Sequence, residues 1–399
     1  MEHTSRRKIN TAYFSEPQAP PATRVRVRRR LEEVKTPVKK RPRLMMHLGY
    51  LAVIVLLIAY ILVNAFFMPG AYSHLSVFAS IPYWDQDRAF ESLRRNSRSI
   101  DFVSVFWYHL DPEGNIATYA DAKEDSTILN FAKANGQKVL ALVANLPDKQ
   151  GESWDSDIVA QVIEGEEARS DHIDALVALA DEKGFDGINI DYEFLEPELR
   201  GDFSLFIRDL GEALHSRGKL LGVAIHPKTG ENNSTENNGS WAQDWVAIHP
   251  YVDHLYFMTY GENSLEDGPG PVATGQWIRE VVAYAQEVGV PNEKIFAGLG
   301  LYGQEWHEKG DAYEGVNADW TYADIVKIVN KNEGDFSRSM QSMVPIYEYG
   351  EEGDRHVIWF EDSESLAKKL HLISKLGVQG VALWRLGGED SKLWEELGH

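Results

Sequence analysis

Residues 185–198 read FDGINIDYEFLEPE, a short apolar run that ends in acidic residues. Apolar and polar residues alternate in its centre: Ile188, Asn189, Ile190, Asp191, Tyr192 and Glu193. Because side chains of a strand point alternately to opposite faces, the three polar groups share one face at intervals of roughly 6.6 Å. Glu193 ends this predicted strand, where parallel barrels carry their chemistry, and Pro197 stops its continuation. The position suits a catalytic acid; the alternative is an ordinary buried strand whose acids pair with distant Lys or Arg.

Apolar runs rich in β-branched and aromatic residues recur along the chain and alternate with helical patterns. Eight of them predict strands, at residues 75–83, 100–109, 138–145, 185–193, 220–226, 252–260, 294–302 and 380–386. Helices are predicted between them, for example at residues 126–135, 169–183, 203–217, 276–288 and 363–376. Eight alternations predict a (β/α)8 barrel. A doubly wound sheet is the alternative, but it would more often carry a Gly-rich phosphate loop where this chain has SIPYWDQD.

The longest connection between predicted strands is residues 304–378. It contains a predicted helix at residues 320–332 and a predicted hairpin, VPIYEYGEEGDRHVIWFED, that turns at residues 350–354. We expect an insertion that walls one side of a cleft, and not a second domain. The polar segment 227–240 is expected to be a mobile loop on the same face of the barrel.

The N-terminal part of the 399-residue chain differs sharply from the rest. Residues 1–45 hold 13 Lys or Arg against four Asp or Glu, a net charge of +9. Residues 46–74 hold none, so the total of −21 leaves −30 for residues 75–399. Residues 1–47 are predicted to be a disordered basic tail. Such a tail could bind anionic lipid or nucleic acid, but no nucleic-acid motif accompanies it, and a topogenic signal beside a membrane is the favoured interpretation.

Residues 48–67, LGYLAVIVLLIAYILVNAFF, are 20 uncharged and mostly apolar residues. As a helix they would extend over roughly 30 Å, so they predict a single transmembrane helix. Basic residues precede this segment and the next is Arg88, which predicts a cytoplasmic N-terminus and a barrel, residues 75–399, outside the cytoplasm. A cleaved signal peptide is the alternative, but its apolar core is usually only roughly 7–15 residues long. The chain has no cysteine, which excludes disulfides and thiolate chemistry.

Aromatic residues gather at the ends of the predicted strands: Trp84, Trp107, Tyr108, Tyr260, Tyr302, Trp306 and Trp384. Flat aromatic faces suit the apolar faces of sugar rings, although any one of these residues could belong to the core. We assign Trp84, Trp107 and Trp384 to substrate binding. His226, His249 and His254 fit neither HExxH nor another compact ligand spacing, so no metal and no cofactor is expected.

Residues 186–193 resemble the D-G-x-x-x-D-x-E signature of family 18 glycoside hydrolases, the chitinase-like enzymes. The fuller family pattern, D-x-x-D-x-D-x-E, maps onto Asp186, Asn189, Asp191 and Glu193, so this chain has an amide where the family has its second acid. VDHLYFMTY at residues 252–260 is similar to the sixth strand of the family, which ends M-x-Y-D; here Gly261 replaces the Asp and Glu262 is a possible substitute.

Two later segments extend the resemblance to about residues 77–397. LGLYG at residues 299–303 is similar to the seventh strand, and GVQGVALWRLGGED at residues 377–390 to the eighth, with its Trp at 384. The endings WRLGGED and MTYGEN are similar, more narrowly, to bacterial modules that are sometimes fused to polysaccharide deacetylases. This chain contains no such partner.

The resemblance implies a retaining, substrate-assisted hydrolysis of β-linked N-acetylglucosamine-containing glycans. Glu193 would protonate the leaving oxygen, while Asp191, beside Asn189, orients and stabilises the attacking acetamide. Tyr260 would hydrogen-bond the acetamide oxygen and Trp384 would form the floor of the subsite. The further substrate contacts expected are Met258 and Glu262. The amide at Asn189 is expected to keep Asp191 ionised over a wider pH range than a third acid would.

Three further residues are candidates at or near the expected site. Asp186 is expected to order the strand from its base, whereas Glu305 and Arg385 could reach substrate or form structural pairs. The alternative function is a barrel that binds such a glycan without cutting it, because Asn189 and Gly261 both depart from the family pattern. A metal hydrolase lacks the histidines it would need. We expect a monomer whose partners are the polysaccharide and, through one helix, a membrane, with no nucleic acid.

Overall fold

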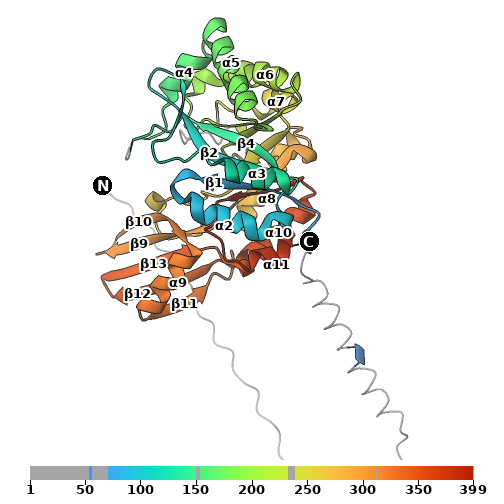
Figure 1. Cartoon of the computed structure of the whole chain (residues 1–399). Coiled ribbons are helices and arrows are strands. Elements are labelled where there is room, and N and C mark those ends of the chain that lie inside the picture. Colours follow the sequence, from blue (N-terminus) through green and yellow to red (C-terminus); the bar gives the residue numbers. More distant parts are fainter. Residues whose placement is uncertain (1–53, 56–70, 150–152, 232–238, 311, 399) are drawn as a thin grey trace, which may run out of the picture. The chain divides into compact units, whose positions relative to one another are not determined.

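The computed structural model describes residues 54–55, 71–149, 153–231, 239–310 and 312–398 (Figure 1). Eight parallel strands form the central sheet: β1 (Ser76–Pro82), β2 (Phe102–Leu110), β4 (Lys138–Ala144), β5 (Gly187–Asp191), β6 (Leu220–Ile225), β7 (His254–Phe257), β8 (Ile295–Gly300) and β14 (Gly380–Trp384). Strand β1 pairs with both β14 and β2, so the sheet closes on itself. A short strand, β3 (Ile116–Thr118), pairs antiparallel with the end of β2. The predicted (β/α)8 barrel is confirmed.

Helices surround the barrel: α2 (Gln86–Asn96), α3 (Ser126–Ala134), α4 (Ser156–Ile163), α5 (Glu166–Glu182), α6 (Arg200–His215), α7 (Trp245–Ile248), α8 (Gly275–Glu287), α10 (Ser363–Leu376) and α11 (Leu393–Leu397). Capping residues define where these helices begin and end. Asp125 accepts a hydrogen bond from the backbone of Thr127 to cap α3, and Gly377, at φ 70°, ends α10 in the left-handed conformation. On α6 the buried residues Phe203, Phe206 and Leu210 recur at helical spacing, so one face packs on the barrel.

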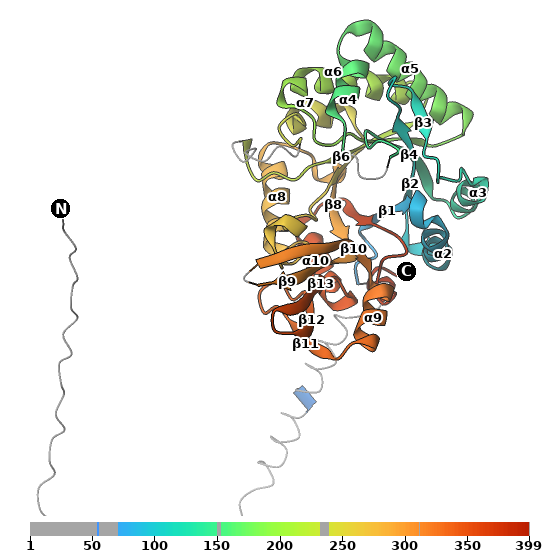
Figure 2. The same cartoon turned by 90° about the vertical axis from the view of Figure 1, so that its left-hand side faces the viewer.

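The insertion between β8 and β14 forms a second, antiparallel sheet in the order β10-β9-β13-β12-β11. Its elements are β9 (Tyr302–Lys309), β10 (Ala312–Thr321), α9 (Tyr322–Lys331), β11 (Gly334–Arg338), β12 (Pro345–Glu351) and β13 (Asp354–Phe360). The predicted helix is α9 and the predicted hairpin is β12 with β13. Strands β9, β10 and β11 were not predicted. Figures 1 and 2 show this sheet on the opposite side of the barrel from α5 and α6.

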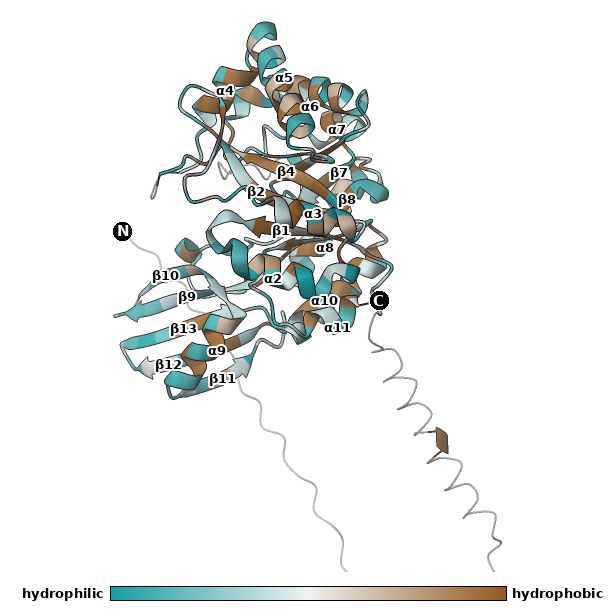
Figure 3. Cartoon of the chain, in the orientation of Figure 1, coloured by the Kyte–Doolittle hydropathy of each residue, from teal (hydrophilic) through white to brown (hydrophobic). Residues whose placement is uncertain are grey.

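Composition explains why the barrel strands could be predicted from the sequence and three strands of the insertion could not. Strand β4, KVLALVA, is apolar along its length, whereas β10, AYEGVNADWT, is largely hydrophilic, as Figure 3 shows. A barrel strand is covered on both faces and therefore reads as an apolar run. The insertion sheet has a small core on one face, around Ile325, Tyr347 and Ile358, and its outer strands are exposed.

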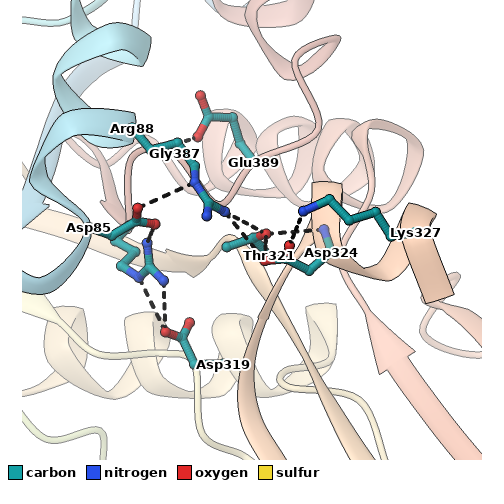
Figure 4. A network of polar contacts seen from close by, with 9 residues as sticks. Asp85, Arg88, Asp319, Thr321, Asp324, Lys327, Gly387 and Glu389 are labelled. Carbon is teal, nitrogen blue, oxygen red and sulfur yellow. Dashed lines mark hydrogen bonds and ion pairs between the residues drawn. The ribbon is translucent and has the colours of Figure 1, made fainter.

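A polar network joins the end of β14 to the insertion (Figure 4). Arg385 is buried, and its guanidinium donates to Asp85 at 2.6 Å and to Asp319 at 2.9 Å. Arg88 continues the network from Asp85 to Thr321. Asp319 and Thr321 belong to β10, so these pairs hold the insertion against the barrel. Of the two roles open to Arg385, the structure shows the structural pairing.

The predicted tail and transmembrane segment lie outside the described residues, except for Ile54 and Val55. Among the residues that the structure does describe, no helix is both long and apolar enough to cross a membrane. The predicted mobile loop is likewise only partly described, because residues 232–238 fall outside those ranges.

Candidate active site

The C-terminal ends of the barrel strands open into a cavity of about 1010 Å³. Strand β5 and the residues after it contribute Asn189, Asp191 and Glu193 to its wall, and the segment after β7 contributes Met258 and Tyr260. Further lining residues come from the other strand ends and from the insertion: Trp84, Phe106, Trp154, His226, Glu262, Gln304, Ala318 and Trp384. The insertion thus forms part of the cleft wall.

Asp191 and Glu193 form the polar centre of this cavity. Asp191 is 5% exposed, and its Oδ1 has no hydrogen-bond partner among the described residues. Burial raises the pKa of Asp191 well above its ordinary value, and the charge of Glu193 and a hydrogen bond with it raise the pKa further. The Glu193 side chain is 13% exposed and faces the cavity. The pair therefore retains a proton at pH values where a free aspartate would have lost it.

Asn145, at the end of β4, fixes the backbone that carries Glu193. The Glu193 amide donates to Asn145 Oδ1 at 2.8 Å, and Asn145 Nδ2 donates to the Glu193 carbonyl at 2.9 Å. The next residue, Phe194, has a φ of 53°, so the chain turns sharply directly after the acid. Asn145 was not singled out from the sequence, although its place as the polar last residue of a predicted strand was a usable signal.

The Asn189 side chain hydrogen-bonds away from Asp191. Its Nδ2 donates to Ser104 Oγ at 3.3 Å, its Oδ1 has no partner, and no hydrogen bond joins it to Asp191 in the described part of the chain. Burial and Glu193 raise the pKa of Asp191 relative to a free aspartate. That the amide keeps Asp191 ionised over a wider pH range than a third acid would stays a prediction. The amide removes a competing acid, but desolvation decides the direction of the shift.

Tyr260 is half-buried beside the acidic pair. Burial raises the pKa of its hydroxyl first, and the charges of Asp191, Tyr302 and Glu193 raise it further. The hydroxyl is thus kept as a neutral donor facing the acids. Met258 is buried and lines the same wall.

Of the three tryptophans assigned to substrate, the structure brings two together. The rings of Trp84 and Trp384 lie 6.1 Å apart at 60°, and Trp84 is 46% exposed in the cavity wall. Trp107 is instead 1% exposed, and its indole N–H donates to Gln86 in the layer between strands and helices. Phe106 lines the cavity instead, because it alternates with Ser104 on the inner face of β2, whereas Trp107 alternates with Val103 and Val105 on the outer face. The assignment of Trp107 to substrate is therefore corrected.

Three of the predicted acids have structural partners or positions. Glu262 lines the cavity, but its carboxylate accepts hydrogen bonds from the backbone N–H and the hydroxyl of Thr274, the residue that caps α8. Glu305 lies in β9 and is 2% exposed within the insertion. Asp186 lies before β5, where it accepts from Lys138 Nζ and from the Val139 N–H, both at 3.0 Å. That places it at the base of the strand, away from the cavity.

The three histidines do not come together. His226 lines the cavity, His249 begins the 3-10 helix His249–Tyr251, and His254 begins β7. In the residues that the structure describes, no group of three or more His, Cys, Asp or Glu side chains could hold a metal ion.

A (β/α)8 barrel with two carboxyl groups and aromatic side chains at the C-terminal mouth is the arrangement of a glycoside hydrolase. The model of the family Glycosyl hydrolases family 18 matches residues 150–389, and the chain belongs to this family. It is 26% identical over 319 residues to the uncharacterized glycosylase YvbX of Bacillus subtilis, covering 80% of this chain and 90% of that protein. It is 24% identical over 307 residues to the cortical fragment-lytic enzyme of Bacillus subtilis, covering 76% and 68%.

Solved structures share this fold. A chitinase from Chromobacterium violaceum superposes with a TM-score of 0.71 at 28% identity and covers 80% of this chain and 96% of its own. The spore cortex-lytic enzyme SleL of Bacillus cereus shares the fold with a TM-score of 0.71 at 22% identity, covering 81% of this chain and 73% of its own.

Proposed function

We propose that this chain hydrolyses β-linked glycans that contain N-acetylglucosamine, with retention of configuration and with the substrate's own acetamide as nucleophile. The observation that carries the proposal is Asp191, which is buried beside Glu193 with one carboxyl oxygen left unpaired. A buried polar atom without a partner is costly, so its retention at the floor of a cavity is typical of a group that binds substrate.

In the proposed reaction, Glu193 donates its proton to the glycosidic oxygen as the bond to the anomeric carbon breaks. The acetamide oxygen attacks that carbon from the other side and forms a cyclic oxazolinium ion. Asp191 orients the acetamide N–H and stabilises the positive charge, and the Tyr260 hydroxyl donates to the acetamide oxygen. The Glu193 carboxylate then takes a proton from the water that opens the ring. Trp384 and Met258 would pack on the sugar.

The charge of the cavity supports a neutral or cationic glycan as substrate. Its described lining contains no Lys or Arg, and its carboxyl groups are Asp191, Glu193, Glu262, Glu266 and Asp267. A strongly anionic polymer would be repelled from such a wall, whereas a neutral or partly deacetylated glycan would not be.

The test is hydrolysis of N-acetylglucosamine oligomers by the full chain in detergent, with products identified by mass. Glu193→Gln should abolish cleavage, because an amide cannot donate the proton. Glu198→Gln is the matched control, since Glu198 is exposed and lies outside the cavity lining. Equal cleavage by wild type and Glu193→Gln would refute the assignment of the acid.

The second candidate function is a barrel that binds the glycan without cutting it. Asn189 stands in place of the family's second acid, and Gly261 in place of the Asp after Tyr260. Binding of the oligomers by both wild type and Glu193→Gln, with no cleavage by either of them or of cell-wall material, would establish it.

We also propose that residues 48–67 anchor the chain in a membrane, with the N-terminus cytoplasmic and the barrel on the other side. The uncharged run of 20 residues and the basic residues before it support this. Protease treatment of intact cells should remove the barrel but spare an N-terminal tag; recovery of the whole chain in the aqueous fraction would contradict the anchor.

A further inference from the structure

Gln304, the third residue of β9, is a buried amide in the wall of the cavity. It is 5% exposed and lines the cavity together with Asp191 and Glu193. Its Oε1 is removed from water and has no hydrogen-bond partner among the described residues. An amide oxygen in this state destabilises a fold, so its place in the cleft is typical of a group that a ligand completes.

The strand holds this side chain in the cleft. Glu305 points into the insertion, where the Trp320 indole donates to it at 2.6 Å, so Gln304 and Trp306 lie on the opposite face of β9. On that face Trp306 is fully buried and donates to the Leu265 carbonyl at 2.9 Å. Leu265 lines the cavity as well. The amide is therefore carried by a strand that is fixed on both faces, and little conformational freedom is lost when it binds a ligand.

Gln304 lies close to the tyrosine that is proposed to hold the acetamide. Tyr302 shares its face of β9, and the Tyr302 ring meets the Tyr260 ring edge-on at 6.5 Å. Side chains on one face of a strand follow each other at roughly 6.6 Å, so Gln304 and Tyr260 can contact the same glycan chain. The described lining of the cavity contains no Lys or Arg, so no cationic side chain there is available to Oε1.

We propose that Gln304 is a specificity-determining residue that binds a hydroxyl group of the glycan. A carboxamide offers one acceptor oxygen and two N–H donors, and a sugar hydroxyl both donates and accepts. The acetamide N–H is assigned to Asp191, so hydroxyl groups are the donors that remain on the same sugar for Oε1. The insertion thereby contacts substrate directly and does more than wall the cleft. This inference rests on the proposed function, because it takes the glycan to lie in this cavity.

The first test measures binding without turnover. N-acetylglucosamine oligomers are titrated calorimetrically into the full-length Glu193→Gln protein in detergent, with and without Gln304→Met. Methionine is of similar length but offers no amide to a hydroxyl, so Kd should rise about tenfold. Gln137→Met is the matched control and should leave Kd unchanged, because Gln137 is also buried with an unpaired Oε1 but lies outside the cavity lining.

The outcomes of this titration separate the two proposals. An equal Kd with and without Gln304→Met overturns the inference and leaves the proposed function intact. Absence of binding by the Glu193→Gln protein itself refutes the proposed function and the inference with it. Weaker binding on adding Gln304→Met, with no cleavage of the oligomers by wild type, leaves the contact standing and refutes the hydrolysis alone.

The second test identifies the hydroxyl group. Oligomers that each lack a single hydroxyl are bound to the same two proteins. One of them should lose about tenfold in affinity for Glu193→Gln and lose nothing further when Gln304→Met is added, because both changes remove the same hydrogen bond. Losses that add for every oligomer overturn the assignment.

A measurement of stability tests for a structural role of the amide. Gln304→Met should leave the free energy of unfolding equal or higher, because it removes a buried group that has no partner. Gln243→Met should lower it, since Gln243 accepts from the His226 N–H at 2.7 Å and donates to the Tyr192 carbonyl at 3.3 Å. A loss in Gln304→Met as large as that in Gln243→Met would show that Gln304 serves the fold and would overturn the inference.

Discussion

Asp191 in the cleft and Glu305 in the insertion are both carboxyl groups removed from water, at 5% and 2% exposure. They differ in their partners. Glu305 accepts hydrogen bonds from Trp320 Nε1 at 2.6 Å, from the Tyr349 hydroxyl at 2.6 Å and from His356 Nδ1 at 2.7 Å. Asp191 keeps one oxygen unpaired and has a second acid as its neighbour.

The difference separates a structural acid from a functional one. A buried carboxylate with a full set of donors stabilises the elements that supply them, here β9, β10, β12 and β13. A buried carboxyl group without them costs about 1–3 kcal/mol, and a fold retains it where a ligand completes the set. Burial alone did not distinguish the two; the count of donors did.

Exchanging the two acids for their amides should therefore give opposite results. Asp191→Asn is expected to lower kcat by about 10²–10³-fold and to leave the free energy of unfolding equal or higher, because an uncharged group replaces a desolvated acid. Glu305→Gln should leave kcat near that of wild type and lower the free energy of unfolding by about 1.5–3 kcal/mol, because charge-assisted bonds are lost. Oligomer hydrolysis and urea denaturation measure both. A stability loss in Asp191→Asn as large as that in Glu305→Gln would break the comparison.

The pH dependence of stability tests the same point through the proton. In the unfolded chain an aspartate titrates near about 3.9, whereas in the fold burial and Glu193 raise the pKa of Asp191. Between the unfolded and the folded pKa of Asp191, the folded protein binds more protons than the unfolded chain does. The contribution of Asp191 to stability is therefore complete below about pH 3.9 and is lost as pH rises through the folded pKa. The free energy of unfolding of Asp191→Asn, relative to wild type, should thus increase with pH. A difference that does not change with pH would contradict the raised pKa.

The same substitution at two tryptophans, one in the insertion and one in the cavity wall, compares a structural role with a functional one. Trp306 in the insertion is fully buried and its indole N–H donates to the Leu265 carbonyl at 2.9 Å. Trp306→Phe should cost about 1–2 kcal/mol in the free energy of unfolding, from the lost hydrogen bond and volume. Trp384→Phe should lower kcat/KM several-fold, roughly in line with weaker stacking, and leave the melting temperature unchanged. A larger loss of stability in Trp384→Phe would show that Trp384 belongs to the core.

The smallest effect is expected from Glu266, an exposed carboxylate in the cavity wall. Glu266→Gln should raise KM for partly deacetylated, cationic oligomers by roughly two- to threefold at low salt and leave KM for neutral oligomers unchanged. Asp267 is unsuitable for this test, because it completes the cap of the 3-10 helix Leu265–Asp267. An equal change for both kinds of oligomer would contradict charge selection by the cleft.

Much of the barrel and the acid could be predicted because both depend on local pattern. A strand covered on both faces leaves an apolar run, and eight such runs separated by helical spacing indicate the barrel. Alternation over residues 188–193 brought Asn189, Asp191 and Glu193 to one face, and strand polarity placed that face at the mouth.

The other features depend on which distant residues meet. Trp107 is an exception, because Phe106 alternates with Ser104 on the inner face of β2 and Trp107 therefore lies on the outer face, so that alternation along this strand was a usable signal. Asn145 and His226 reach Glu193 from β4 and β6, and both contacts exist only because these strands flank β5. Periodicity therefore specified the elements and the face that carries the acids. Tertiary packing decided the partners of each carboxyl group, because desolvation and hydrogen bonding depend on neighbours in space.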